Sequence, residues 1–152
     1  MIDVREATPA DAAALAALRW EFRAGRQPAV ENRDPFVERC SAWMRTQLES
    51  GFPWRAWVAE DARRLVGHVW LHTIDKVPNP NGEPERHAYL SNLYVTPAAR
   101  GGAGTRLLET ALAWAKTHGV DHVLLWPTER SRTLYARYGF RASGEFLNRP
   151  SS

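Results

Sequence analysis

The segment LSNLYVTPAARGGAGTRLL, residues 90–108, changes from an apolar run to a glycine-rich turn and then to a helical pattern. The apolar residues up to Val95 favour a strand, and Pro97 ends it. From Thr105 onward, apolar residues recur at spacings of three, four and seven, which predicts an amphipathic helix. A strand, a tight turn and a helix in this order restrict the chain to folds that contain α/β units.

The glycine-rich turn is predicted to bind an anion. Gly101, Gly102 and Gly104 occupy the first turn of the predicted helix, whose N–H groups have no partner within the helix. These donors and the positive end of the helix dipole attract an anion, typically a phosphate. Arg100 and Arg106 flank the turn and can add charge-assisted hydrogen bonds.

Two common phosphate-binding motifs do not match this turn. A dinucleotide fingerprint requires a third glycine where this chain has Leu107, and an acid at the end of the next strand. A P-loop requires Gly-Lys followed by Ser or Thr, which occurs nowhere in the sequence. The predicted phosphate site therefore belongs to another family of proteins.

Length and composition predict one globular domain of residues 1–148 followed by a frayed tail of residues 149–152. The net charge of +3 is spread along the chain, which argues against a nucleic-acid partner. Cys40 is the single cysteine and is expected to be a packing thiol, so an intrachain disulfide or a multi-cysteine zinc site is excluded. No segment approaches the ~20 apolar residues of a membrane span, and we expect a cytoplasmic protein without a membrane partner or a bound metal.

The remaining pattern predicts the order β α α β β β α β α β. Three strands precede the first strand–helix–strand crossover, which excludes a doubly wound fold. The predicted strands are residues 2–7, 55–60, 64–73, 88–95, 120–126 and 140–147, and the predicted helices are residues 12–23, 35–50, 105–118 and 129–138. Residues 74–86 contain three prolines and a glycine and are expected to form a loop.

Three segments in this order resemble the GCN5-related N-acetyltransferase (GNAT) superfamily over nearly the whole chain. The opening IDVREATPADAAALAALR is similar to the first strand and helix of that family. NLYVTPAARGGAGTRLL resembles its acetyl-CoA motif, with a turn one residue shorter than the common form. LYARYGF, residues 134–140, resembles the LYxxxGF signature that follows the fifth strand.

The resemblance implies a single α/β (α+β) domain with a mixed sheet of six to seven strands, flanked by about four helices and splayed between the fourth and fifth strands. It implies acetyl-CoA as cosubstrate, with the pantetheine arm between those two strands and the pyrophosphate on the glycine turn. The cofactor-binding residues carried over are Leu93, Tyr94, Val95, Arg100, Gly101, Gly102, Ala103, Gly104, Thr105, Thr128, Ser131 and Arg132. Thr128 stands where the family commonly has asparagine.

The resemblance also implies a general acid. Tyr135 matches the family tyrosine that is often proposed to protonate the departing thiolate, and its alternative role is that of a core residue on an amphipathic helix. A general base is not apparent. The family often has a glutamate on the fourth strand, whereas the predicted strand here carries Ser91 and Asn92, and neither side chain is basic. Glu85, His72 and His87 are the candidates, and proton transfer to solvent water is the alternative.

The acceptor is predicted to be a primary amine on a small molecule or, as a second choice, on a peptide. Trp20 and Glu21 are the predicted contacts, because aromatic rings and carboxylates attract a cationic amine. Direct attack in a ternary complex is the predicted mechanism. A degenerate family member that binds CoA as a sensor or structural module is the alternative, and an unrelated phosphate-binding protein is a third. A homodimer is neither required nor excluded by any feature of the sequence.

Overall fold

The computed structural model describes residues 1–99, 101–144 and 146–151. The described residues form a five-stranded sheet with the order β1-β2-β3-β4-β5. The strands are β1 (Ile2–Glu6), β2 (Trp54–Asp61), β3 (Arg64–Asp75), β4 (Arg86–Val95) and β5 (Val120–Leu124). The pairs β1–β2, β2–β3 and β3–β4 are antiparallel, and β5 is parallel to β4. This mixed sheet confirms the predicted fold class, with fewer strands than expected.

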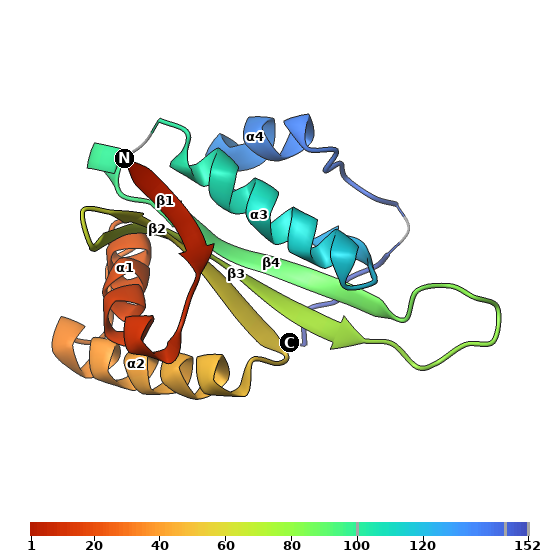
Figure 1. Cartoon of the computed structure of the whole chain (residues 1–152), viewed down its shortest axis with the longest axis horizontal. Coiled ribbons are helices and arrows are strands. Elements are labelled where there is room, and N and C mark those ends of the chain that lie inside the picture. Colours follow the sequence, from red (N-terminus) through yellow and green to blue (C-terminus); the bar gives the residue numbers. More distant parts are fainter. Residues whose placement is uncertain (100, 145, 152) are drawn as a thin grey trace.

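Two helical layers cover the sheet, as Figure 1 shows. Helices α1 (Ala12–Ala24) and α2 (Arg33–Ser50) pack on one face, and α3 (Ala103–Thr117) and α4 (Arg132–Arg137) lie on the other. Short 3-10 turns precede or follow them at η1 (Pro9–Asp11), η2 (Pro97–Ala99) and η3 (Glu129–Ser131). None of the helices in the described residues has the length and apolarity to cross a bilayer.

Each layer has its own apolar core. Leu15 and Met44 pack with Trp70 between the sheet and the α1–α2 layer, and these three side chains are at most 2% exposed. Leu107 and Leu108 of α3 are fully buried on the opposite face, together with Leu71 of β3. Alternation along β3 produces this division, because successive strand side chains point to opposite faces.

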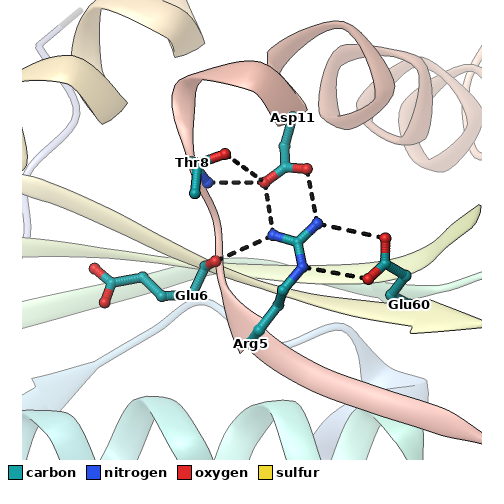
Figure 2. A network of polar contacts seen from close by, with 5 residues as sticks. All are labelled: Arg5, Glu6, Thr8, Asp11 and Glu60. Atoms are coloured by element: carbon teal, nitrogen blue, oxygen red, sulfur yellow. Dashed lines mark hydrogen bonds and ion pairs between the residues drawn. The ribbon is translucent and has the colours of Figure 1, made fainter. Parts of the chain in front are cut away.

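A network of polar contacts fixes the corner between β1 and α1 (Figure 2). Both terminal nitrogens of Arg5 donate to the Asp11 carboxylate at 2.9 Å, and Arg5 Nε donates to Glu60 at 3.3 Å. Asp11 also accepts a 2.8 Å bond from the main-chain N–H of Thr8. Arg5 therefore lowers the pKa of Asp11 through direct hydrogen bonds and charge. The network ties the first helix to the sheet edge.

The predicted strand over residues 140–147 is wrong: the described residues of this segment form no strand. Phe146 and Leu147 are 57% and 96% exposed. Adjacent strand residues face opposite sides of a sheet, so this segment offers no single apolar face to bury. The difference accounts for the five strands found where six to seven were predicted.

Candidate functional site

Strand β4 changes its course at Asn92. The β3–β4 register passes from Trp70↔Ser91 to His68↔Tyr94, so two residues of β4 lie opposite one residue of β3. Asn92 has a φ of 57°, in the left-handed region, as expected for a β-bulge. The parallel register with β5 ends at Tyr89↔Leu124. Leu124 is also the last residue of β5, so β4 continues from Leu90 to Val95 without a β5 partner, at the place where the splay was predicted.

The glycine turn leads directly into α3. Gly101 and Gly102 have φ values of 134° and 116°, which other residues rarely adopt. Gly102 is the N-cap of α3, and no side chain caps the helix there. A Cβ atom at Gly101 or Gly102 would meet nothing within 4 Å. The turn thus presents backbone donors to an open space, as a phosphate site requires. Arg100 lies outside the described residues.

One large cleft joins these two features. It has a volume of about 1790 Å³ and is lined by the second half of β4, the glycine turn, the segment after β5 and residues of α1, α2 and α4. The parts of its lining differ in chemistry. Gly102, Gly104 and Thr105 line it at the N-terminus of α3, whereas arginines line it from α1 and α2, which lie on the other face of the sheet (Figure 1). The cleft can therefore hold a long ligand with a phosphate-bearing part.

Tyr135 of α4 lines the cleft, although only 8% of the residue is exposed. Its ring packs edge-on against Phe140, with ring centroids 5.5 Å apart. Burial raises the pKa of the Tyr135 phenol to about 12, so the hydroxyl stays protonated at neutral pH. A protonated phenol in the cleft can donate a hydrogen bond, and this position also agrees with a role in the core.

The model of the acetyltransferase (GNAT) family matches residues 15–140. The chain belongs to this family. The match confirms the family that the three sequence segments predicted, and it supports an acetyltransferase activity. No curated protein matches the sequence.

Solved structures of GNAT proteins are similar over almost the whole chain. A GCN5-related N-acetyltransferase from Ralstonia eutropha JMP134 is 23% identical, with a TM-score of 0.80 and coverage of 100% of both chains. A predicted acetyltransferase from Clostridium acetobutylicum, solved with acetyl-CoA, is 23% identical with a TM-score of 0.79, covering 99% of this chain and 96% of that one. An aminoglycoside acetyltransferase from a soil metagenomic sample is 21% identical with a TM-score of 0.73, covering 100% and 99%. At these identities the likeness concerns the fold.

Most of the predicted cofactor-binding residues line the cleft of this GNAT domain. These are Leu93, Tyr94, Val95, Gly101, Gly102, Gly104, Thr105, Thr128 and Ser131. Thr128 and Ser131 bond to each other, because the Thr128 N–H donates to Ser131 Oγ at 2.9 Å and the Ser131 N–H donates to Thr128 Oγ1 at 3.2 Å. They fix the turn that begins η3.

Two predicted cofactor residues are placed differently. Ala103 buries its side chain in the core and is the first residue of α3, so only its main chain belongs to the turn. Arg132 is not among the cleft residues, and its Nε donates to Glu129 at 3.2 Å. Its neighbours Arg130 and Arg137 line the cleft instead. A short helix with arginines on several faces does not reveal from sequence which one turns inward.

The three candidate bases are not among the residues that line the cleft. His72 packs against the Trp54 ring at 4.6 Å. Glu85 accepts a 2.8 Å bond from the main-chain N–H of Asn79 in the loop before β4. His87 Nδ1 lies 2.8 Å from Asp121 Oδ1. The structure therefore brings none of the three predicted bases into the cleft.

The two residues of α1 that were predicted to contact the acceptor line different cavities. Glu21 lines the large cleft, and its carboxylate accepts a 3.0 Å bond from the Tyr94 hydroxyl. Trp20 instead lines a smaller pocket of about 260 Å³ beside Phe36. The structure therefore brings Glu21 into the large cleft together with its neighbour Phe22, and places Trp20 in the smaller pocket.

Sequence reasoning missed Arg19 and Asn92, which meet at the bulge. Arg19 Nη1 donates to Asn92 Oδ1, and both residues line the cleft. It also missed His68 of β3, which is fully buried opposite Tyr94 of β4. Trp70 Nε1 donates to His68 Nδ1 at 3.1 Å, so the ring hydrogen sits on Nε2. Burial lowers the pKa of His68 to about 3, and the ring is neutral.

One cluster outside the cleft has atoms of the kind that bind metals. Ligating atoms of His87, Asp121 and His122 lie within 4.8 Å of one another at the start of β4 and β5. Lys76 Nζ already neutralises Asp121 at 3.0 Å. This cluster lies away from the glycine turn and is not part of the acetyltransferase cleft.

Proposed function

We propose that this protein transfers the acetyl group of acetyl-CoA to a primary amine, by direct attack in a ternary complex. The observation that carries the proposal is the continuous cleft from the glycine turn, past the point where β4 and β5 separate, to Arg19. A cleft of this form can hold a phosphate-bearing cosubstrate at one end and a second substrate at the other. The family match supports the acyl chemistry.

The phosphate end fits CoA. The main-chain N–H groups of residues 101–105 bind the pyrophosphate at the start of α3, where the helix dipole is positive. Arg130 and Arg137 line the same cleft and offer cations to the remaining phosphate charge. The pantetheine arm then lies along β4, beside Leu93, Tyr94 and Val95.

The reaction breaks one bond and forms one. The amine nitrogen attacks the thioester carbonyl carbon, and the carbon–sulfur bond breaks with its electron pair passing to sulfur. A main-chain N–H of β4 stabilises the carbonyl oxygen as it gains negative charge. Solvent water takes the proton that the nitrogen loses, because none of the three predicted bases lines the cleft.

Tyr135 assists the departure of sulfur. Its pKa of about 12 exceeds the value of about 8.5 typical of a thiol, so complete proton transfer to the thiolate is uphill. A hydrogen bond from the phenol to the developing thiolate carries no such cost and still lowers the barrier. Tyr135 therefore acts as a hydrogen-bond donor to sulfur during bond cleavage and keeps its proton, and the released CoA thiolate takes a proton from solvent.

The test is calorimetric titration with acetyl-CoA, followed by a thiol-release assay with a panel of amines. One-to-one binding that weakens with dephospho-CoA, together with CoA release that depends on an amine, would support the proposal. Binding without release in the presence of any amine would favour the sensor or structural alternative. Absence of binding would leave the likeness at the level of the fold.

A further inference from the structure

The acceptor end of the cleft is rich in positive charge. Arg19, Arg23, Arg26 and Arg39 line it from α1, α2 and the segment between them, and Glu21 is the acidic residue that lines it from the same segments. Glu21 is already bonded to the Tyr94 hydroxyl. This distribution differs from the carboxylate-lined site that the sequence predicted for a cationic amine.

The arginines are not equivalent. Arg39 is paired at 2.9 Å with Glu31, a residue that does not line the cleft. Arg23 and Arg26 lie over the Phe22 ring, with guanidinium carbons 6.0 and 5.5 Å from its centroid. Arg19 has neither arrangement. Its Nη1 donates a hydrogen bond to the Asn92 amide oxygen, and among the described residues no carboxylate forms an ion pair with it.

Arg19 is also the deepest of these charges. The side chain is half-buried, and burial lowers its pKa below the ordinary value, although the guanidinium remains charged. The nearby Cys40 thiol does not supply an anion, because burial raises its pKa. A guanidinium has five N–H donors in a planar fork, of which the Asn92 bond uses one. A desolvated cation with unused donors is a good binding site for a carboxylate.

Asn92 places this cation beside the reacting centre. It forms the bulge of β4 immediately before Leu93, the first of the residues along which the pantetheine arm lies in the proposed function. An anionic group held by Arg19 is consequently close to the amine that attacks. The two groups of the acceptor must then be separated by only a few bonds.

We propose that the acceptor is an amino acid or a closely related compound, whose carboxylate is bound by Arg19 while its neighbouring amine attacks acetyl-CoA. This inference rests on the proposed function. The reaction turns a zwitterion into an N-acetylated anion, with the amine proton released to solvent. The aromatic residues Phe22, Phe36 and Trp54 of the same cleft favour an apolar side chain on the acceptor.

The experiment compares matched acceptors in a thiol-release assay with the full chain. L-Phenylalanine and L-leucine are each compared with the corresponding amide and with the amine that lacks the carboxyl group, and spermidine and kanamycin serve as cationic acceptors. We expect kcat/KM to be about 10- to 100-fold higher for the carboxylates, as for the loss of one hydrogen-bonded charge pair. Preference for the amides, the simple amines or the cationic acceptors would overturn the inference and leave the proposed acetyl transfer intact.

Variants assign the effect to Arg19. Arg19→Gln should raise KM for the carboxylate acceptors about 10- to 100-fold, with little change in KM for the amides or for acetyl-CoA. Arg19→Lys keeps the positive charge but loses the planar fork of donors, so its KM for the carboxylate acceptors should lie between those of the parent chain and Arg19→Gln. Arg45→Gln, on the exposed surface of α2, is the matched control. Equal losses for carboxylates and amides would reduce Arg19 to a structural partner of Asn92. Absence of transfer to every amine would overturn the proposed function and this inference with it.

Discussion

Replacing Gly104 by glutamate tests the phosphate site without damaging the fold. Gly104 is the second residue of α3 and lines the cleft. A Cβ atom there would meet only the Val95 Cγ2 atom, at 3.7 Å, which is an ordinary contact. The residue also has no positive φ. A side chain at this position therefore enters the cleft and leaves the core undisturbed.

The expected magnitude follows from charge. A carboxylate about 5 Å from one phosphate charge costs about 3 kcal/mol at the effective dielectric near a protein surface, or roughly 200-fold in Kd. The steric block adds to this. The stability of α3 should increase while the affinity decreases, because an acidic residue in the first turn of a helix stabilises it by about 0.3–1 kcal/mol. Binding and stability should thus change with opposite signs.

The assay is calorimetric titration with acetyl-CoA, paired with thermal unfolding. Gly104→Glu should lose binding by at least two orders of magnitude while Tm stays constant or rises. Gly104→Ala is the matched control, and it should fold at least as well as the parent chain and lose much less affinity. Parent-like affinity in a folded Gly104→Glu variant would refute the phosphate site at the start of α3.

Three further changes test other parts of the account. Tyr135→Phe should lower kcat about 10- to 1,000-fold with little change in acetyl-CoA affinity. An unchanged kcat would mean that Tyr135 serves only as a packing residue of the core. Asp11→Asn should lower the free energy of unfolding by about 1–2 kcal/mol at pH 7 in denaturant titrations. The pKa of Asp11 is lowered below its ordinary 3.8, so its contribution to the free energy of unfolding is present above pH 3.8 and is lost as the pH falls through the folded pKa. A stability difference between parent and variant that does not change with pH would contradict this. Gly67→Ala would bring a Cβ within 2.9 Å of the Tyr94 carbonyl oxygen and should cost about 1–3 kcal/mol in the same titration, unlike an alanine at Gly144, where nothing lies within 4 Å.

The glycine turn before α3 was predictable because local chemistry determines it. A turn that needs two residues at positive φ selects glycine, and the helix that follows exposes its N–H groups whatever packs around it. Gly101 and Gly102 thus mark the turn directly in the sequence. The point at which the β4–β5 pairing ends could be predicted only through the family resemblance, because no residue pattern within Leu90–Val95 indicates where a neighbouring strand ends.

The base candidates illustrate what sequence position cannot supply. His72 and His87 lie close to the ends of β3 and β4, which suggested a place in the cleft. The β3–β4 register pairs His87 with Ile74, and pairs His72 with Tyr89, the first residue of β4 that lines the cleft, yet neither histidine lines it. Register depends on long-range pairing, and the β-bulge displaces the later residues of β4 by one. Distance along the chain from the glycine turn was therefore a poor guide to distance from the reacting centre.

The acceptor half depended on which side chains of α1 face the sheet. Arg19 and Glu21 both line the cleft while Trp20 lies in the smaller pocket, so the aromatic residue that suggested a cationic acceptor points elsewhere. A half-buried arginine carries a cost that an exposed one does not, because desolvation penalises a charge without an anionic partner. The fold tolerates that cost at Arg19 through one neutral hydrogen bond to Asn92. An acceptor carboxylate would offset it, which gives the arginine a physical reason to occupy the cleft.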